Sequence, residues 1–189
     1  MKITNYDYEI TSNCFYEENS HTFLKNSAIN TKGERFISFD LKWTKIKDAK
    51  SYALVLIDYE ASRVIGQAFV HWIVANIKQN YLELGANINN KNIIQGLNST
   101  VEGASDNRKG TIIECVPGGF KNNADKAADF FPPMPPDDRH LYTVKIYALD
   151  IEKINLENGY HLSELYEEMH NHIITEFETH FWFNPEGDK

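Results

Sequence analysis

Two strand-like runs separated by a polar turn dominate the hydrophobic pattern, within residues 51–77. Residues 52–57 are apolar at every position, which predicts a strand buried on both faces. This run ends at Asp58, and His71 stands at the start of a second apolar run over residues 70–77. If the two strands share a sheet, the acid and the imidazole lie close together. The rest of the chain is expected to build around that corner.

Alternation of apolar and polar residues predicts three further strands. Residues 35–43 alternate with one apolar face, and residues 177–183 alternate in the same way as a final strand. In residues 140–149 the even-numbered apolar side chains share one face, and His140 has their parity. The His140 ring is therefore expected to point inward at a strand end. Residues 1–35 are polar and irregular and are interpreted as an edge strand with loops.

A late helix and a long irregular middle complete the pattern. Apolar residues in 161–174 recur at intervals of three and four and predict a helix with one apolar stripe, made of Leu162, Leu165, Tyr166, Met169 and Ile173. Between residues 78 and 139 the pattern weakens to a short strand at 111–116 and one or two helical turns at 124–130. Four prolines between residues 132 and 136 then predict a rigid wall outside the sheet, because proline lacks an amide donor and fixes φ.

These elements predict a mainly β fold: an antiparallel, sandwich-like β domain with a C-terminal helix and long connecting loops. The chain has 189 residues and 42% hydrophobic residues, enough for one well-formed core. No internal repeat and no linker divides it, so a single domain over residues 1–189 is expected. The loop at 96–132 is long for a small domain, which indicates either a functional loop or an element that the pattern does not reveal.

Charge and cysteine content narrow the partners and the compartment. A net charge of −8 and a pI near 5.3 argue against nucleic acid and anionic membranes, because both are polyanions. No signal peptide and no apolar run of about 20 residues is present, so no integral membrane segment is expected. Cys14 and Cys115 are expected to be reduced thiols in a cytoplasmic protein, although a disulfide between them stays open.

The remaining motifs favour neither a metal centre nor covalent catalysis. His172, Glu176 and His180 are spaced by four, but the alternation that begins at Phe177 predicts a strand there, which would separate them. No nucleophile motif, phosphate-binding loop or dinucleotide fingerprint is present. No metal, no cofactor and no catalytic residues are therefore predicted.

Taken in order, the motifs resemble the phosphatidylethanolamine-binding protein family, also called Raf kinase inhibitor protein-like. That family carries Asp-Pro-Asp-Ala-Pro after a hydrophobic strand and a His-Trp or His-His pair opening the next. The matching positions here are Asp58-Tyr59-Glu60-Ala61-Ser62 and His71-Trp72. The family's second motif, a Pro-Pro loop leading to His-Arg-Tyr, matches Pro135-Pro136-Asp137-Asp138-Arg139-His140-Leu141-Tyr142. The resemblance covers roughly residues 36–183, and the helix before the last strand resembles the bacterial and archaeal branch.

The sequence departs from the family pattern at several positions. Tyr59 and Ser62 replace both prolines of the first motif, Glu60 replaces its second Asp, and Leu141 replaces an Arg. A Gly-Tyr-x-Gly segment before the Pro-Pro loop is missing. The fold is expected to survive these changes, whereas the ligand preference is left open.

The resemblance implies a small surface pocket for phosphate or a phosphorylated head group. His71 and His140 would supply N–H donors to the anion, and Asp58 would accept a hydrogen bond and fix a histidine tautomer. Pro135, Pro136 and Tyr142 would shape the wall, and Asp58 or Glu60 would pair with an amine on the ligand. We therefore predict a non-enzymatic binding or regulatory protein with a kinase or protease as partner. The bacterial branch is often dimeric, so a homodimer is also expected.

Two alternatives remain open. The first is a hydrolase of a small phosphorylated or ester substrate, with His71 and His140 as acid and base and Asp58 as the orienting group. The second is a vestigial pocket, because the glycine and proline positions of the family motifs are altered.

Overall fold

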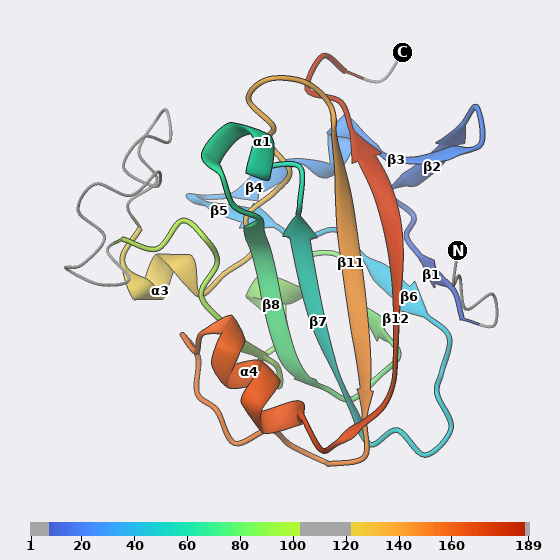
Figure 1. Ribbon diagram of the computed structural model, residues 1–189, viewed down its shortest axis with the longest axis vertical. Coiled ribbons are helices and arrows are strands. Elements are labelled where there is room, and N and C mark those ends of the chain that lie inside the picture. The colour runs from blue at the N-terminus through green and yellow to red at the C-terminus, as the bar shows by residue number, and fades with distance from the viewer. Residues whose placement is uncertain (1–7, 103–121, 188–189) are drawn as a thin grey trace.

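A seven-stranded sheet runs through the computed structural model, which describes residues 8–102 and 122–187 (Figure 1). Its strands lie in the order β10-β8-β7-β11-β12-β3-β2. Neighbouring strands are antiparallel except β12 and β3, which pair in parallel. Their bounds are β2 Phe15–Glu18, β3 His21–Leu24, β7 Ser51–Asp58, β8 Phe69–Ile77, β10 Ile94–Gln95, β11 His140–Leu149 and β12 Ile173–Phe183.

Smaller elements cover both faces of this sheet. On one side lies a three-stranded sheet of β1 Ile10–Thr11, β6 Leu41–Trp43 and β9 Tyr81–Leu82. On the other lies α4 Leu162–Met169, which packs against β7 and β8 and appears beside the lower part of β8 in Figure 1. The remaining elements are the hairpin of β4 Asn30–Lys32 and β5 Arg35–Ile37 and the short helices η1 Asn26–Ala28, α1 Ser62–Ile65, α2 Ala86–Asn89 and α3 Ala124–Ala127.

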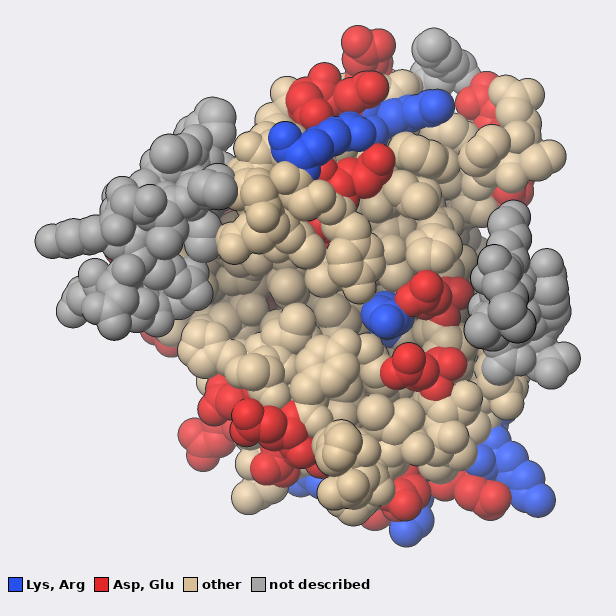
Figure 2. Space-filling view, viewed as in Figure 1, with Lys and Arg blue, Asp and Glu red and all other residues tan. Residues whose placement is uncertain are grey.

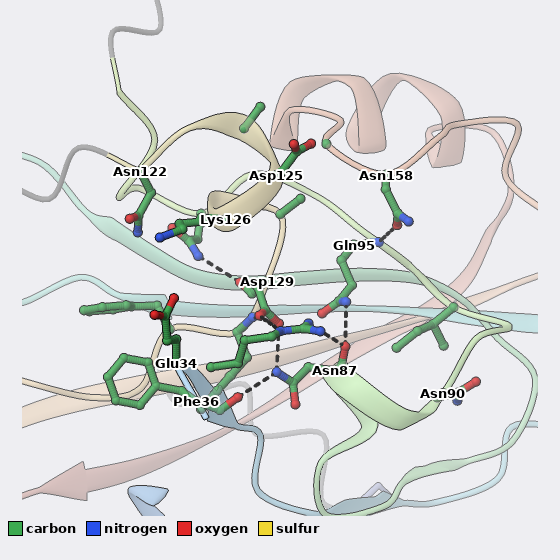
Figure 3. Close-up of a pocket in the computed structure, with 18 of the residues that line it drawn as sticks. Glu34, Phe36, Asn87, Asn90, Gln95, Asn122, Asp125, Lys126, Asp129 and Asn158 are labelled. Atoms are coloured by element: carbon green, nitrogen blue, oxygen red, sulfur yellow. Dashed lines mark hydrogen bonds and ion pairs between the residues drawn. The ribbon is translucent and has the colours of Figure 1, made fainter. Parts of the chain in front are cut away.

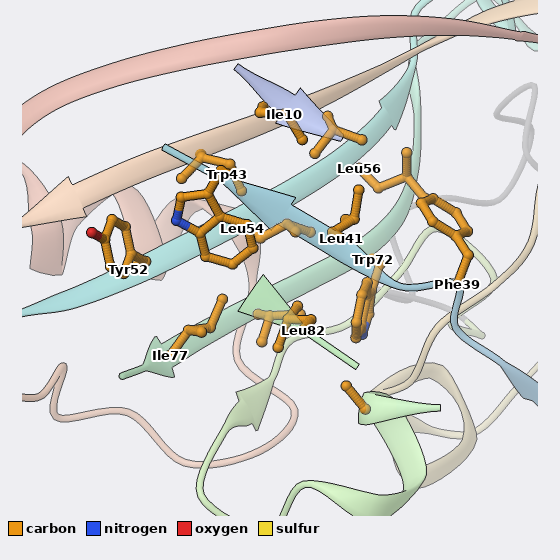
Figure 4. Close-up of a cluster of buried hydrophobic side chains, with 14 of the residues drawn as sticks. Ile10, Phe39, Leu41, Trp43, Tyr52, Leu54, Leu56, Trp72, Ile77 and Leu82 are labelled. Atoms are coloured by element: carbon orange, nitrogen blue, oxygen red, sulfur yellow. The ribbon is translucent and has the colours of Figure 1, made fainter. Parts of the chain in front are cut away.

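The inner strand β7 is buried at every residue because each face meets a separate apolar cluster. Tyr52, Leu54 and Leu56 pack toward β6 and β9, with Trp43 and Trp72 among their neighbours in the larger cluster (Figure 4). The residues between them, at positions 53, 55 and 57, face α4 in the second cluster with Leu165 and Met169. The prediction of a strand buried on both faces is confirmed, and so is the mainly β, sandwich-like fold with one C-terminal helix.

The predicted strands β8, β11 and β12 are also confirmed. The even-numbered residues 142–148 of β11 all belong to the larger core cluster, and the His140 ring is buried with them. The helical turns expected at 124–130 reduce to α3, whose first turn is capped by the Asn123 side chain. Residues 130–136 form neither helix nor strand, as the prolines predict.

The single strand predicted over 35–43 is wrong, because the chain leaves the sheet between β5 and β6. There, side chains from elsewhere replace a strand partner. The Ser38 amide donates to Asn87 Oδ1 at 2.9 Å, and the Asp40 carboxylate accepts from Ser12 and Asn13. Alternation in the sequence continues through this break, so the pattern alone does not reveal it.

The helix predicted over 161–174 ends early, at Met169. His161 and Glu164 form a capping box at its start, and the His172 amide donates to the Met169 carbonyl in the turn after it. Ile173 then begins β12 instead of completing the helical stripe.

The strand predicted at 111–116 and Cys115 lie outside the described residues, whereas Cys14 is described as a free thiol. Within the described chain, no helix combines the length and the apolar run that crossing a bilayer requires.

Candidate functional site

A cavity of about 150 Å³ lies at one end of the seven-stranded sheet, beside α1. In Figure 1 the end of β7, the start of β8 and the start of β11 meet there. Register explains the meeting, because Asp58 pairs with Phe69 on one side and with Tyr142 on the other. The residues that line the cavity are Asp58, Ala61, Val64, Ile65, Phe69, His71, Phe131, Met134, Pro135, Pro136, His140 and Tyr142.

Asp58 is the last residue of β7 and is only 3% exposed. One carboxylate oxygen accepts the Ala61 amide at 3.0 Å, which fixes the turn into α1. The other lies 2.6 Å from Nδ1 of His140. Asp58 and His140 are therefore two buried groups in short contact, which is the geometry that an orienting role of Asp58 would require.

His140 stands between two carboxylates. Its Nδ1 faces Asp58, and its Nε2 lies 2.8 Å from Oδ1 of Asp137, three residues earlier in the chain. An ionised carboxylate can only accept, so the ring donates from both nitrogens when both acids are ionised. His140 then carries the positive charge of the site.

Asp137 also contacts the surface network at the mouth of the cavity. Its second oxygen accepts from Arg63 Nε at 3.0 Å, and Arg63 reaches Glu60 at 3.2 Å and the Arg139 carbonyl at 3.2 Å. In Figure 2 basic and acidic side chains lie together at this end of the molecule. The mouth is thus ringed by paired charges, while the cavity wall behind it is largely apolar.

His71 occupies a different environment from His140. Its Nδ1 lies 3.0 Å from the Phe131 carbonyl oxygen, so this nitrogen carries the proton and donates. Burial lowers the pKa of His71 to about 4, against the opposing effect of the Asp58 charge. The ring is therefore neutral near pH 7 and its Nε2 is an acceptor. This differs from the expectation that both histidines offer N–H donors to an anion.

Tyr142 places a buried hydroxyl without a hydrogen-bond partner at the cavity. The side chain stacks against Phe181, and its ring also meets the edge of His71. Burial raises the pKa of the Tyr142 phenol, and the nearby Asp58 charge adds to the effect. The group is therefore a neutral O–H at any ordinary pH, and it lies close to Asp58.

The other expected site residues divide into wall and support. Pro135 and Pro136 line the cavity beside Phe131 and Met134. Glu60 is not among the residues that line it: its carboxylate accepts the Leu141 amide and pairs with Arg63. The structure thus brings together Asp58, His71, His140, Tyr142 and the two prolines. Glu60 lies outside this group and stabilises the start of β11 through the Leu141 amide.

Sequence reasoning missed the part of Asp137, which lies in the irregular bend before β11. A signal was present: an acid three residues before His140, directly after the rigid Pro135-Pro136 pair. Without the fold, nothing distinguished it from the neighbouring solvated Asp138.

A second, larger cavity of about 800 Å³ also went unpredicted. It lies between α2, α3 and the segment around Asp129 (Figure 3). Its buried polar groups bond to one another. The Asn87 amide donates to Asp129 at 2.7 Å, Gln95 donates to the Asn87 carbonyl at 2.9 Å, and Arg35 pairs with Asp129 at 2.7 Å. Asparagines scattered through loops have no periodicity, so no pattern along the chain indicates this network.

The histidines considered for a metal site do not converge. His172 lies in the turn before β12 and contacts Asp150, whereas His180 is within β12 and contacts Thr143. Across residues 8–102 and 122–187, no three side chains of the metal-ligating types come together as a metal site.

Comparison with known proteins gives consistent matches. The family model described as phosphatidylethanolamine-binding protein matches residues 19–184. The protein YxkA of Bacillus subtilis is 32% identical over 165 residues, which cover 85% of this chain and 89% of that protein. A UPF0098 protein of Methanothermobacter thermautotrophicus is 28% identical over 163 residues, covering 81% and 92%.

Solved structures agree with these sequence matches. A phosphatidylethanolamine-binding protein homologue from Chlamydia trachomatis superimposes with a TM-score of 0.66 at 25% identity, covering 94% of this chain and 97% of that one. Escherichia coli YbcL, described as a member of the mammalian family, has the same fold, with a TM-score of 0.64 at 22% identity over 94% and 98%.

Proposed function

The chain belongs to the phosphatidylethanolamine-binding protein family, and on that basis we propose that it is a non-enzymatic protein that binds a phosphate-type head group in the 150 Å³ cavity. The observation that carries the proposal is the buried, unpartnered Tyr142 hydroxyl beside the Asp58–His140 pair. A buried hydroxyl without a partner costs about 1–3 kcal/mol, and a ligand acceptor would remove that cost.

The polar groups of the cavity match an oxyanion that keeps one proton. Tyr142 O–H and His140 Nε2–H are donors for two ligand oxygens. His71 Nε2 and Asp58 can only accept, so they suit a remaining P–OH group. A phosphate monoester loses its second proton near pH 6, so its singly charged form is present under mildly acidic conditions. The fixed charge of Asp58 disfavours the dianion.

Shape and contact strength point to a small and weakly held group. The wall is apolar at Val64, Ile65, Phe69 and Phe131, so it suits the carbon side of an ester rather than a second charge. Charge-assisted hydrogen bonds contribute about 1.5–3 kcal/mol each. Two of them give a dissociation constant on the order of a millimolar before other contacts are counted.

A binding role is favoured over hydrolysis by the side chains at the cavity. No Ser, Thr, Cys or Lys is among the described residues that line it, so the cavity offers no hydroxyl, thiol or amine nucleophile of these four residue types. Turnover of generic phosphate or carboxyl esters, abolished by His71→Ala and by His140→Ala, would overturn the non-enzymatic assignment.

A kinase or protease partner belongs to the same proposal, because apolar side chains are exposed beside the cavity. Met134 lines the mouth and is 51% exposed, and Tyr59, next to Asp58 in the chain, is 49% exposed. A partner that covers these two side chains would also cover a bound head group.

Light scattering of the purified chain would separately test the expected homodimer.

The test of the ligand assignment is a titration with inorganic phosphate and with phosphoethanolamine, followed by ¹⁵N shifts of the histidine rings. His71 and His140 signals should move at millimolar ligand, and Tyr142→Phe should weaken the response about tenfold. His172→Gln is the matched control, because the His172 side chain is 41% exposed and its ring contacts Asp150, outside the cavity. Unmoved His71 and His140 signals would instead indicate a vestigial pocket.

A further inference from the structure

We propose that Asp137 is an internal competitor for the ligand: its carboxylate occupies the oxyanion position at His140 Nε2, and an anion binds by displacing it. This inference rests on the proposed function, because it concerns the same cavity. It assigns to Asp137 the control of how tightly, and in which charge state, an anion is held.

The geometry at His140 supports the assignment. Oδ1 of Asp137 lies 2.8 Å from Nε2, which is the donor that the proposed phosphate oxygen would need. The His140 side chain is 1% exposed, whereas that of Asp137 is 41% exposed. The carboxylate therefore covers the buried donor from the solvent side. A carboxylate oxygen and a phosphate oxygen make the same charge-assisted bond, so the two are direct rivals for one proton.

The two acids on His140 differ in their freedom to leave. Asp58 is buried and holds the Ala61 amide with its other oxygen, so removing it would leave an imidazolium and an amide unpaired inside the protein. Asp137 is at the surface, and water can solvate it once it moves. The inner carboxylate is thus fixed and the outer one is exchangeable.

Arg63 provides a second partner that the displaced carboxylate can keep. Its Nε lies 3.0 Å from Oδ2 of Asp137, and the Arg63 side chain is 43% exposed. The same guanidinium bonds to Glu60 and to the Arg139 carbonyl, so it stays at the mouth when the contact with His140 breaks. Displacement therefore exchanges one hydrogen bond and leaves the ion pair at the surface intact.

The negative charge of Asp137 at the mouth of the cavity influences which charge state of the anion binds. With Asp58 and Asp137 both ionised, His140 is outnumbered by two carboxylates, so a dianion meets net repulsion. The displaced Asp137 remains near the cavity and keeps part of that repulsion. Removing its charge should therefore tighten binding and reduce the preference for the singly charged anion.

The test measures inorganic phosphate binding by calorimetry and by the His140 ¹⁵N signals, at constant ionic strength. Asp137→Ala should bind phosphate at least about tenfold more tightly than the unmodified chain, since one charge-assisted bond no longer has to be broken. Asp137→Asn keeps an acceptor without the charge, so its affinity should fall between the two. Asp138→Asn is the matched control: it removes the same charge one residue away, where Asp138 accepts the Arg139 amide instead of contacting His140.

The possible outcomes distinguish a failure of the competitor role of Asp137 from a failure of the proposed phosphate binding. If the unmodified chain binds phosphate and Asp137→Ala binds it equally well, the competitor role is overturned while the binding function stands. Equal tightening by Asp137→Ala and Asp138→Asn would also overturn it, because the effect would then be general charge. If no variant binds phosphate at millimolar concentrations, both proposals fail. In the ligand-free state, an unchanged His140 Nε2 shift in Asp137→Ala would show that the contact is absent in solution.

Discussion

The two cavities share Phe131 as part of their walls, yet they differ in whether their buried polar side chains have hydrogen-bond partners. In the larger one, the buried side chains of Asn87, Gln95, Asn98 and Asp129 all find partners within the protein. In the smaller one, Tyr142 keeps an unmatched hydroxyl. Among the described residues of the two linings, that hydroxyl is the one buried side-chain atom without a partner.

The difference shows that volume is a poor guide to where a ligand binds. A network whose donors and acceptors are all satisfied rigidifies the fold and gains little from a ligand. An unmatched buried donor costs free energy until something accepts from it. We therefore interpret the hydrogen-bonded network of the larger cavity as a structural connection between α2, α3 and β5. The smaller cavity is the better candidate for a ligand site.

The largest expected effect tests the structural role of the larger cavity. Asp129→Ala should lower the free energy of unfolding by about 3 kcal/mol, because the Asn87 amide, the Phe130 amide and Arg35 lose their shared acceptor. Urea unfolding would measure it, with the exposed Asp125→Ala of the same cavity as control. Phosphate affinity should stay within about twofold. A tenfold loss of affinity in Asp129→Ala would contradict the division of roles.

The next effect is a pH dependence that belongs to the smaller cavity. His71 has a folded-state pKa of about 4 against the ordinary 6.5, so the unfolded chain binds a proton first as pH falls. Stability should therefore decrease from about pH 6.5 to pH 4, by about 3 kcal/mol in total, and the loss from this group should level off below pH 4. Urea unfolding of the unmodified chain and of His71→Gln across this range isolates the contribution. Parallel curves for the two proteins would show that His71 is not buried as a neutral ring.

A smaller effect is expected where α2 begins. Gly85 has φ +74°, and an added Cβ would meet Asn89 Nδ2 at 3.0 Å and Ile37 Cγ2 at 3.3 Å. Gly85→Ala should therefore cost about 1–2 kcal/mol of stability and disturb the helix that carries Asn87. Gly33→Ala is the matched control, because Gly33 has φ +67° with nothing within 4 Å of the new atom. Equal losses at both sites, measured by thermal unfolding, would mean that backbone strain alone accounts for the cost.

The smallest expected stability change distinguishes a buried hydroxyl that lacks a hydrogen-bond partner from one that has a partner. Tyr142→Phe should leave the ligand-free protein as stable as before or up to about 1 kcal/mol more stable, because it removes a hydroxyl that no group satisfies. Tyr147→Phe should instead cost about 1 kcal/mol, since the Tyr147 hydroxyl is hydrogen-bonded to that of Tyr166. Denaturant midpoints of the two variants would decide it. A clear loss of stability in Tyr142→Phe would reveal a partner for the hydroxyl in the ligand-free state.

Strand parity explains why part of the site was predictable. Asp58, His71 and His140 lie at the ends of long regular strands, where alternation and register determine which side chains converge. Asp137 escaped because it lies in a bend, where the direction of a side chain depends on tertiary contacts. The break at Ser38 escaped for a related reason: its partner, Asn87, is 49 residues away in sequence. Periodicity reports local geometry, whereas these features depend on distant polar groups.

The parallel pairing of β12 with β3 has a consequence for how the molecule assembles. The hairpin of β2 and β3 joins the main sheet through β12, near Phe23 and Trp182, so its place at the sheet edge does not exist until the late strand is laid down. During synthesis the earliest hairpin must wait, with its edge unpaired, while more than a hundred residues follow it. Closure of so long a loop is slow, so this docking step is expected to limit the rate of folding.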